Sequence, residues 1–483
     1  MSPEVALEQL KTREQRYALG QFFTPVHIAE HMAAAVREVN PQTVLDPGVG
    51  GGVLLRAVDD GRRRLFGIDV DPEAVRLAAQ SMPRAELAVG DFLNPSAWPF
   101  SEQAFDAVIS NPPYIRHHNL SADHKALAGR YSARLGQKVS ALSGSYVYFF
   151  LEALLHLNEG GRLVFVTPTE FLDVRYGQAV KAALLEHCDI EEVLVLEMDE
   201  LAFDGVLTTS AITVATKRAQ PSRRFRLVEG RANGAIELGR AVELAADSAP
   251  AYMPWTPFLP TRAERILALI EHRTTTLSNY VRVRRGIATG GNSFFCLTDA
   301  EVEKWEIRRE WLVPVVLGSK DLPGAGVLDE AFRAERLAAG ARGWLLWCHE
   351  PKEALPLELR RYIAHGEALG LPERFNCKTR RPWYGVEPVA PPDFFVTYMS
   401  RDRARFIRNG VGARCMTSLL NVWALVGVDL DELQAELQDP TMSSLLREYG
   451  RTYGGGLGKI EPGDVLRVPS RPLATAGQSR LAV

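Results

Sequence analysis

The sequence is poor in cysteine and contains no paired cysteine motif. Its five cysteines are spread over 483 residues and never form C-x-x-C. They are Cys188, Cys296, Cys348, Cys377 and Cys415. This spacing argues against a zinc module and against a disulfide framework, so we expect no metal site and a reducing cytoplasm as the environment.

Long apolar runs and an excess of one charge are also missing. No uninterrupted apolar run reaches about 18 residues, so we predict no membrane span. The polar segment Met1–Arg16 lacks the apolar core of a secretory signal. A net charge of -3 excludes a uniformly basic nucleic-acid coat but leaves room for a local basic cleft. With 46% hydrophobic and 24% charged residues, the chain is globular, and its length predicts two domains.

Apolar runs alternate with helical patterns through the first half of the chain, as is typical of a parallel α/β sheet. The runs predicted as strands are Thr43–Leu45, Arg64–Ile68, Ala85–Val89, Phe105–Ile109, Arg162–Val166, Glu192–Leu196 and Ala211–Ala215. The helices predicted around them are Pro25–Val36, Gly52–Val58, Pro72–Gln80, Tyr146–Leu157 and Glu170–Glu186. We therefore expect a seven-stranded, doubly wound, Rossmann-like sheet with a ligand crevice at the carboxyl ends of its strands.

The segment from about Arg218 to Thr261 has a different character. It is rich in Ala, Pro and Gly and its periodicity is weak, so we predict the domain boundary there, with domains at 1–245 and 246–483. The second half has short apolar runs, turn residues and clustered arginines, which predict a mixed α+β domain.

Acidic residues follow three of the predicted strands. Asp46 precedes a glycine-rich turn that contains Gly48 and Gly50, at a place where a pyrophosphate would be repelled and an amino group would be favoured. Asp69 follows about 20 residues later, where a carboxylate accepts from ribose hydroxyls. Asp91 then supplies an acceptor for an adenine amine, and Phe92 a ring beside it. Together they predict an adenosine pocket without a phosphate site, which favours S-adenosylmethionine over NAD.

A tetrapeptide of the type needed for amine methylation ends the fourth strand. The exocyclic amine of a base is a poor nucleophile because its lone pair is delocalised into the ring. The Asn111 side-chain oxygen and the Pro112 carbonyl can accept hydrogen bonds from its two N–H groups. Pro112 and Pro113 stiffen the turn. Tyr114 offers a ring on which a flipped base can stack.

The combined pattern resembles the adenine-N6 DNA methyltransferases of restriction–modification systems, in the arrangement where a target-recognition domain follows the catalytic domain. The segment Gly20–Pro25 is similar to their first cofactor motif, and Ser145–Glu152 to the helix beside the cofactor. The resemblance implies Asn111, Pro112, Pro113 and Tyr114 as catalytic residues. It implies cofactor contacts from Phe23, Thr24, Pro25, Asp46, Gly48, Gly50, Asp69, Val70, Asp91, Phe92 and Asn111.

The resemblance also implies contacts to double-stranded DNA. Tyr114 and Phe203 are expected to hold the flipped base between them. The expected duplex contacts of the second half are Arg282, Arg284, Arg285, Arg380, Arg381 and Arg401. We favour Arg380 and Arg381 as base readers because the adjacent Trp383-Tyr384 pair could brace a guanidinium plane.

Two departures and several alternatives accompany this resemblance. Val49 and Gly51 replace the Cys and Ser that relatives usually carry in the glycine turn, and His117 and His118 open a stretch expected to be a mobile loop to about Gly144. Alternative activities are cytosine-N4 methylation of DNA, methylation of a protein glutamine or an RNA amine, and a specificity subunit with an inactive catalytic domain. We find no nuclease pattern, so a restriction endonuclease would be a separate chain in a bacterial or archaeal cytoplasm. The choice between monomer and dimer stays open.

Overall fold

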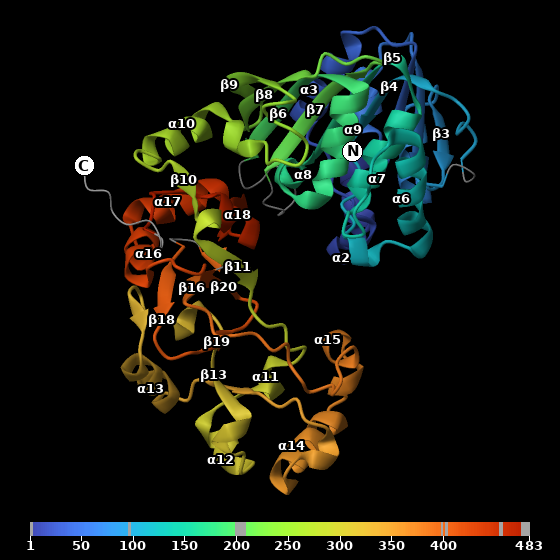
Figure 1. Cartoon of the computed structure of the whole chain (residues 1–483). Coiled ribbons are helices and arrows are strands. Elements are labelled where there is room, and N and C mark those ends of the chain that lie inside the picture. The colour runs from blue at the N-terminus through green and yellow to red at the C-terminus, as the bar shows by residue number, and fades with distance from the viewer. Residues whose placement is uncertain are drawn as a thin grey trace. The chain divides into compact units, whose positions relative to one another are not determined.

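The two halves of the sequence fold as two separate units, Met1–Glu264 and Arg265–Val483 (Figure 1). The structure is a computed structural model that describes residues 3–94, 98–198, 209–397, 399–400, 404–453 and 457–474. Residues 246–264 belong with the first unit, so the division of the chain lies after the predicted boundary at residue 245.

The first unit is built on a nine-stranded sheet with the order β3-β2-β1-β4-β5-β7-β6-β8-β9. Its strands are β1 (Thr43–Pro47), β2 (Arg64–Asp69), β3 (Glu86–Val89), β4 (Phe105–Ser110), β5 (Leu157–Pro168), β6 (Cys188–Met198), β7 (Ser210–Lys217), β8 (Arg224–Ala232) and β9 (Ile236–Ala245). Strands β1 to β5 pair in parallel, and β7 lies antiparallel between β5 and β6. The α/β class and all seven predicted strands are confirmed.

The prediction of a linker from about Arg218 was wrong, because β8 and β9 extend the sheet there. Strand β9 pairs with β8 alone and exposes most of its side chains. An edge strand of this kind buries few apolar residues, and the apolar periodicity that marks an internal strand is therefore weak.

Helices cover both faces of this sheet. One face carries α3 (Val26–Arg37), α4 (Val53–Val58) and α5 (Pro72–Ser81). The other face carries α6 (Ala122–Leu135), α7 (Ser145–Leu155), α8 (Glu170–Asp173) and α9 (Gln178–His187). Helices α1 (Pro3–Leu10) and α2 (Arg13–Leu19) precede them in the chain. Each face has its own hydrophobic core: Ile28 and Val44 lie in one, and Phe150 and Phe165 in the other. Two corrections follow. The helix predicted over Glu170–Glu186 is divided, and the stretch predicted as a mobile loop contains α6.

The second unit is mixed α+β, as predicted. Its main sheet has the order β11-β20-β16-β18-β14, and a second sheet the order β12-β15-β13-β19. These strands are β11 (Val281–Arg285), β12 (Cys296–Leu297), β13 (Leu312–Val316), β14 (Val327–Leu328), β15 (Trp344–Leu346), β16 (Phe394–Thr397), β18 (Phe406–Asn409), β19 (Arg414–Cys415) and β20 (Leu419–Ala424). The short strands are β10 (Thr275–Thr276), β17 (Met399–Ser400), β21 (Arg451–Tyr453), β22 (Leu457–Lys459) and β23 (Pro469–Ser470).

The helices of the second half are α10 (Pro260–Leu269), α11 (Asn292–Phe295), α12 (Asp299–Lys304), α13 (Glu330–Ala338), α14 (Leu357–Ala368), α15 (Phe375–Lys378), α16 (Leu430–Leu437), α17 (Pro440–Tyr449) and α18 (Pro462–Arg467). Separate hydrophobic cores lie around β13 and β15 and around β11 and β20. In the portion of the chain that the structure describes, no helix has the length and apolar character to cross a membrane.

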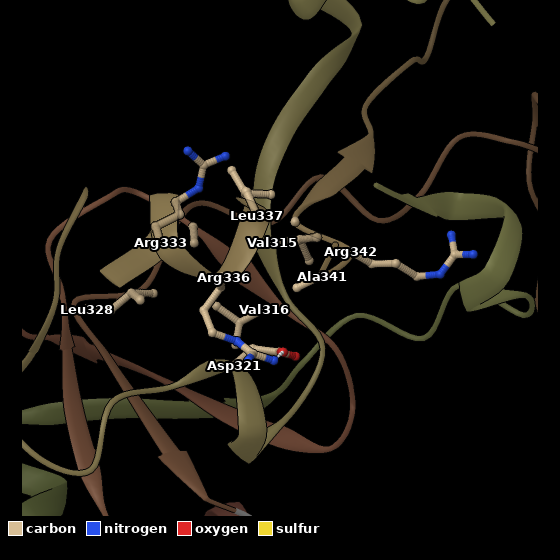
Figure 2. Close-up of a pocket in the computed structure, with 11 residues that line it drawn as sticks. Val315, Val316, Asp321, Leu328, Arg333, Arg336, Leu337, Ala341 and Arg342 are labelled. Carbon is tan, nitrogen blue, oxygen red and sulfur yellow. Dashed lines mark hydrogen bonds and ion pairs between the residues drawn. The ribbon is translucent and has the colours of Figure 1, made fainter. Parts of the chain in front are cut away.

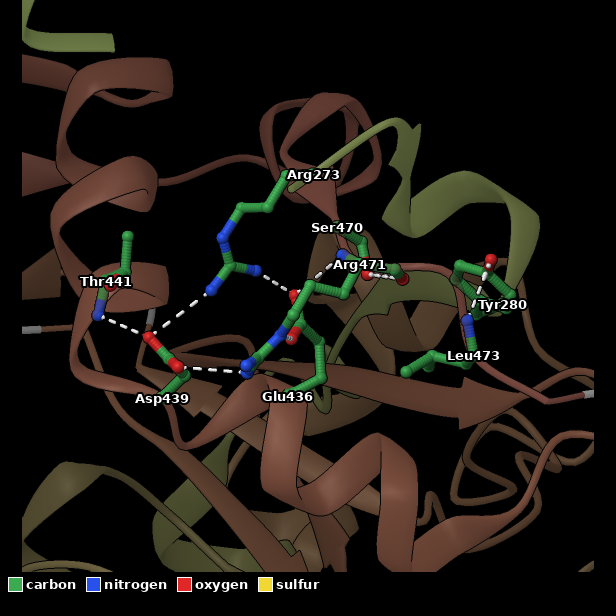
Figure 3. Close-up of polar contacts among 8 residues, drawn as sticks. All are labelled: Arg273, Tyr280, Glu436, Asp439, Thr441, Ser470, Arg471 and Leu473. Atoms are coloured by element: carbon green, nitrogen blue, oxygen red, sulfur yellow. Dashed lines mark hydrogen bonds and ion pairs between the residues drawn. The ribbon is translucent and has the colours of Figure 1, made fainter. Parts of the chain in front are cut away.

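A buried ion network joins the start and the end of the second unit (Figure 3). Arg273 donates to Glu436, and both residues are almost fully buried. Arg471, from the segment after β23, donates to Glu436 at 2.6 Å and to Asp439 at 2.9 Å. Arg273 also lies 3.3 Å from Asp439. Removing one carboxylate from such a network leaves a buried guanidinium without its main partner, which is costly in free energy.

We expect Glu436→Ala to lower the free energy of unfolding of the second unit by about 3–5 kcal/mol, the usual cost of breaking a buried ion pair. Urea unfolding followed by tryptophan fluorescence measures the change. The matched control is Glu271→Ala, because the side chain of Glu271 is 84% exposed. Equal unfolding midpoints for the two variants would contradict this role for the network.

Candidate active site

The predicted site residues meet where neighbouring parallel strands end. The register pairs Asp46 of β1 with Gly67 of β2, and Asp69 at the end of β2 with Val89 of β3. Strand β4 lies on the other side of β1 and ends at Ser110, directly before Asn111. Because these strands run in parallel, their carboxyl ends bring the three acidic segments and the predicted catalytic turn to one edge of the sheet.

Asn111 is held in one orientation by the N-terminal segment. Its side-chain Nδ2 donates to the Phe22 carbonyl at 2.9 Å and to the Thr24 hydroxyl at 3.1 Å. Because a carbonyl can only accept, the amide nitrogen must face Phe22, and Oδ1 faces the other way. There Oδ1 accepts a hydrogen bond from the Tyr114 hydroxyl at 2.6 Å.

The rest of the turn is held from two further sides. The Tyr114 amide donates to the Gly20 carbonyl at 3.2 Å, and a Cβ on Gly20 would lie 2.7 Å from that amide nitrogen. Gly20 also has a φ of +66°, so both the close approach and the backbone conformation call for glycine. From α7, the Ser145 hydroxyl donates to the Pro113 carbonyl and accepts from the Ile115 amide.

Aromatic rings surround Tyr114. The ring of Phe22 is stacked on it at 5.4 Å, and Tyr146 meets it edge-on at 6.5 Å. Burial raises the pKa of Tyr114, so its hydroxyl stays protonated and acts as a donor. Phe22 is thus the aromatic residue of this segment at the turn, and Phe23 stays a predicted cofactor contact. The predicted second aromatic, Phe203, lies outside the described residues.

Asp46 is buried at the end of β1 with one oxygen unsatisfied. The residue is 1% exposed, and its Oδ1 has no hydrogen-bond partner among the residues that the structure describes. Burial, and then the nearby charge of Asp69, raise the pKa of Asp46 well above its ordinary value. A buried carboxylate oxygen without a donor favours a ligand that brings a donor or a positive charge.

Asp69 ties the glycine turn to the end of β2. Its two oxygens accept from the Gly50 amide at 2.9 Å and from the Asp71 amide at 2.9 Å. Gly48 and Gly50 have φ values of +102° and +49°, and nothing lies within 4 Å of a Cβ built on Gly50. The turn therefore leaves open space beside Gly50. Val70, the next predicted contact, is exposed.

Helix α1 accounts for one departure in the glycine turn. A Cβ on Gly51 would lie 2.8 Å from Glu4 Oε1, and Glu4 also accepts from Arg56 at 2.5 Å. A larger residue at position 51 would displace this contact. Val49 is buried, and its side chain fills the space beside Gly67. Both departures thus fit the local packing.

The side chain of Phe92 lies in the core, whereas that of Asp91 is partly exposed to solvent. Phe92 is 2% exposed and packs against Phe149 and Trp98. The side chain of Asp91 is 31% exposed, and its Oδ2 lies 2.6 Å from Nε2 of His124. His124 lies in the first turn of α6, where its amide donates to the capping hydroxyl of Ser121.

Sequence reasoning did not identify several side chains that this site uses. They are Lys11 and Gln21, which both contact the Asp71 carboxylate, Phe22, His124 and Ser145. Gln21, Phe22 and Ser145 lie within the two segments Gly20–Pro25 and Ser145–Glu152 that the sequence analysis named, whereas Lys11 and His124 are identified only by their contacts. His117 and His118 lie in a short 3-10 turn, with His118 exposed.

The predicted arginines of the second unit have different environments. Arg282 lies over the Trp423 ring at 4.8 Å, whereas Arg284 pairs with Glu387 at 2.9 Å and Arg285 with Glu461 at 2.5 Å. Arg380 Nη1 donates to the Thr289 carbonyl at 2.8 Å. Arg401 lies outside the described residues.

The expected bracing of Arg380 and Arg381 by Trp383-Tyr384 was wrong. Tyr384 is buried and donates to the Glu350 carbonyl, and Trp383 packs against Phe294 and Phe295. The ring that Arg380 overlies is that of Phe295, at 5.8 Å. Trp383 and Tyr384 are neighbours of the two arginines in sequence, but their rings pack in the core of the second unit.

A separate small pocket lies in the second unit, beside α13 and β13 (Figure 2). Its lining is mainly aliphatic, with Asp321 and Arg336 facing each other at 3.2 Å. Arg342 turns away and pairs with Glu301. This lining contains no cysteine, histidine or hydroxyl group that could act as a nucleophile or base.

Comparisons with known proteins find related restriction–modification methylases for both halves of the chain. The model of the Eco57I restriction-modification methylase family matches residues 63–203, and that of the C-terminal domain of the Type II methyltransferase M.Eco57I matches residues 253–481. The chain is 26% identical to Type II methyltransferase M.AccI of Acinetobacter calcoaceticus, over 94% of this chain and 85% of that protein. It is 28% identical to M.XamI of Xanthomonas campestris pv. amaranthicola, over 97% of this chain and 88% of that protein.

A solved structure gives the same fold over most of the chain. The Type IIL restriction-modification enzyme MmeI, determined in complex with DNA, superposes with a TM-score of 0.58 at 12% sequence identity. The match covers 97% of this chain and 70% of MmeI. At this identity the likeness extends to the fold.

We expect Asp46→Asn to stabilise the ligand-free protein at neutral pH. Because burial raises the pKa of Asp46 in the folded state, the wild type loses stability as pH rises from the ordinary pKa of 3.8 towards the raised value. A neutral amide avoids this loss, and we expect a gain of roughly 0.5–2 kcal/mol near pH 7.5, as for other strained functional sites. The gain should vanish below about pH 4, where the carboxyl is protonated in both states.

Urea unfolding at the two pH values measures this difference. Asp247→Asn is the control, because the side chain of Asp247 is 93% exposed. An equal effect of both substitutions, or a gain for Asp46→Asn that persists at low pH, would contradict the assignment of a raised pKa to this carboxyl.

Proposed function

Because the chain belongs to the Eco57I restriction–modification methylases, which are DNA methyltransferases, we propose that it transfers a methyl group to N6 of adenine in duplex DNA, with S-adenosylmethionine as the donor. The observation that carries this proposal is the orientation of Asn111. Its Nδ2 is used by Phe22 and Thr24, which leaves Oδ1 as an acceptor at the sheet edge, beside Tyr114.

The residues present fit S-adenosylmethionine. The unsatisfied Oδ1 of Asp46 suits the ammonium group of the methionine portion, and the space beside Gly50 gives the ligand room at the turn. Asp69 retains lone pairs for ribose hydroxyls, and Asp91 can accept from the adenine amine. Phe23, Thr24, Pro25, Gly48, Val70 and Phe92 are the further proposed contacts. When bound, the cofactor supplies an electrophilic methyl group.

The turn residues prepare the amine of the target base. The Asn111 Oδ1 and the Pro112 carbonyl accept hydrogen bonds from the two N–H groups of this amine. These bonds direct the nitrogen lone pair away from the ring. For this, the Tyr114 hydroxyl must release Asn111 Oδ1, to which it donates at 2.6 Å. The ring of Tyr114 is then available to stack on a base that has left the duplex, opposite Phe203 in this proposal.

The second half supplies DNA recognition in this proposal. Residues 265–483 form the target-recognition domain, and Arg282, Arg284, Arg285, Arg380, Arg381 and Arg401 belong to its DNA surface. Arg282 retains an exposed guanidinium over Trp423, while Arg284 and Arg285 would exchange a carboxylate partner for a phosphate. Any restriction endonuclease of the system would be a separate chain.

We expect tritiated S-adenosylmethionine and duplex DNA to yield N6-methyladenine on nucleoside analysis. Asn111→Ala should lower the rate by at least about 100-fold, in line with the loss of one transition-state hydrogen bond, and leave the dissociation constant for DNA nearly unchanged. A methylcytosine product would overturn the proposed base. Weakened DNA binding by Asn111→Ala would place Asn111 in binding rather than catalysis.

We also expect His124 to position Asp91 for the adenine amine. His124→Ala removes the contact to Asp91 and should weaken binding of S-adenosylhomocysteine by about 3- to 10-fold, the value of one hydrogen bond. Binding of the inosine analogue, which lacks the 6-amino group, should be unchanged in calorimetric titration. The control is His118→Ala, an exposed residue. Equal weakening for both ligands would instead indicate a general packing role for His124.

A further inference from the structure

Helix α15 and the residues after it present an exposed aromatic ring among positive charges. Phe375 is 79% exposed, a large value for an aromatic side chain. Residues 373–381 carry four cations and one carboxylate, Glu373. The cations are Arg374, Lys378, Arg380 and Arg381. Lys378 Nζ lies 5.7 Å from the centre of the Phe375 ring, so charge and ring are adjacent in space.

Within the residues that the structure describes, these four cations have no carboxylate partner, whereas several other arginines of the second unit do. Arg284, Arg308 and Arg408 each pair with a carboxylate within 3.2 Å. Among the described residues, no carboxylate lies within 4.0 Å of the charged groups of Arg374, Lys378, Arg380 or Arg381. In the described part of the chain, no ion pair therefore neutralises their positive charge.

The α15 segment, residues 374–381, is firmly attached to the loop that contains Gly290. Arg374 donates to the Gly290 carbonyl at 3.0 Å, and Arg380 to the Thr289 carbonyl at 2.8 Å. The buried Cys377 thiol also lies against the Thr289 carbonyl. A Cβ on Gly290, whose φ is +87°, would lie 3.0 Å from Cys377 Sγ, so the two segments approach closely. The exposed Phe375 is thus carried on a fixed support.

Stacking against other apolar groups stabilises an exposed aromatic ring. Contact with anions likewise stabilises cations that have no carboxylate partner. Duplex DNA offers both within a few ångströms, since stacked bases lie between two phosphate backbones. We propose that Phe375 is a wedge that enters the base stack of the bound duplex, while Arg374, Lys378 and Arg381 contact the flanking phosphates. Arg380 instead supports the segment, because its Nη1 and Nη2 both donate to backbone carbonyls, whereas the carbonyl contacts of Arg374 and Arg381 use Nη1 alone. This inference rests on the proposed action on DNA.

The test measures the dissociation constants of Phe375→Ala and Phe375→Trp for duplex DNA by fluorescence anisotropy. The labelled duplex contains the sequence that the wild-type protein methylates. Phe375→Ala should raise the dissociation constant about 5- to 100-fold, the range measured for base–aromatic stacking, with an unchanged salt slope. Phe375→Trp should retain affinity. Arg381→Ala should reduce the log–log salt slope by about one unit, as expected for one lost phosphate contact.

Leu369→Ala is the matched control, because Leu369 is an exposed apolar residue near the segment but outside the cation cluster. If Phe375→Ala binds the duplex as tightly as wild type, the proposed wedge is refuted. This is also the result expected if Phe375 binds another protein instead of DNA. An equal loss for Leu369→Ala refutes it as well. Wild-type protein that neither binds nor methylates duplex DNA refutes the proposed function itself, so the two failures are distinguishable.

Discussion

The hydrogen bonds between the Asn111 amide and the N-terminal segment are the contacts on which the site depends. They fix the side chain so that its nitrogen faces Phe22 and Thr24 and its oxygen faces Tyr114. A strand end alone would place Asn111 at the edge of the sheet without defining which side of its amide is presented. The nine-stranded sheet brings the residue to the right place, and a segment outside the sheet gives it its chemistry.

The same edge contains a conflict between stability and binding. Asp46 is buried with an unsatisfied oxygen close to Asp69, an arrangement that disfavours its charged form in the ligand-free chain. A cationic ligand would relieve both problems together, because it supplies the missing donor and offsets the repulsion. If S-adenosylmethionine binds here as proposed, part of its binding energy comes from removing the unfavourable burial of this carboxylate.

The sequence predicted most elements that bury a clear apolar pattern, with β8 as an exception. The first seven strands have such patterns, and the acids that follow them could be assigned to one sheet edge because the carboxyl ends of parallel strands lie together. Strand β9 and helix α6 were missed because each buries few side chains; in α6 these are Tyr131 and Leu135. Their positions are determined by tertiary contacts, which a local pattern does not contain.

Partners distant in sequence set a second limit. Nothing near His124 indicates its contact with Asp91, and nothing near Ser145 indicates that it bonds the Pro113 carbonyl. Arg380 illustrates the same limit for the second unit. A cluster of arginines beside aromatic residues predicts a nucleic-acid surface, but composition does not distinguish a free guanidinium from one that donates to backbone carbonyls.

The separation of 89 residues between Phe22 and Asn111 has a consequence for synthesis on the ribosome. The N-terminal segment leaves the ribosome early, yet its partners at the turn are made later, and Ser145 of α7 later still. Contacts between such distant residues form slowly because a long loop must close first. The nascent chain therefore carries the segment Gly20–Pro25 for some time without its partners, and the turn gains its contact from α7 only after Ser145 has been made.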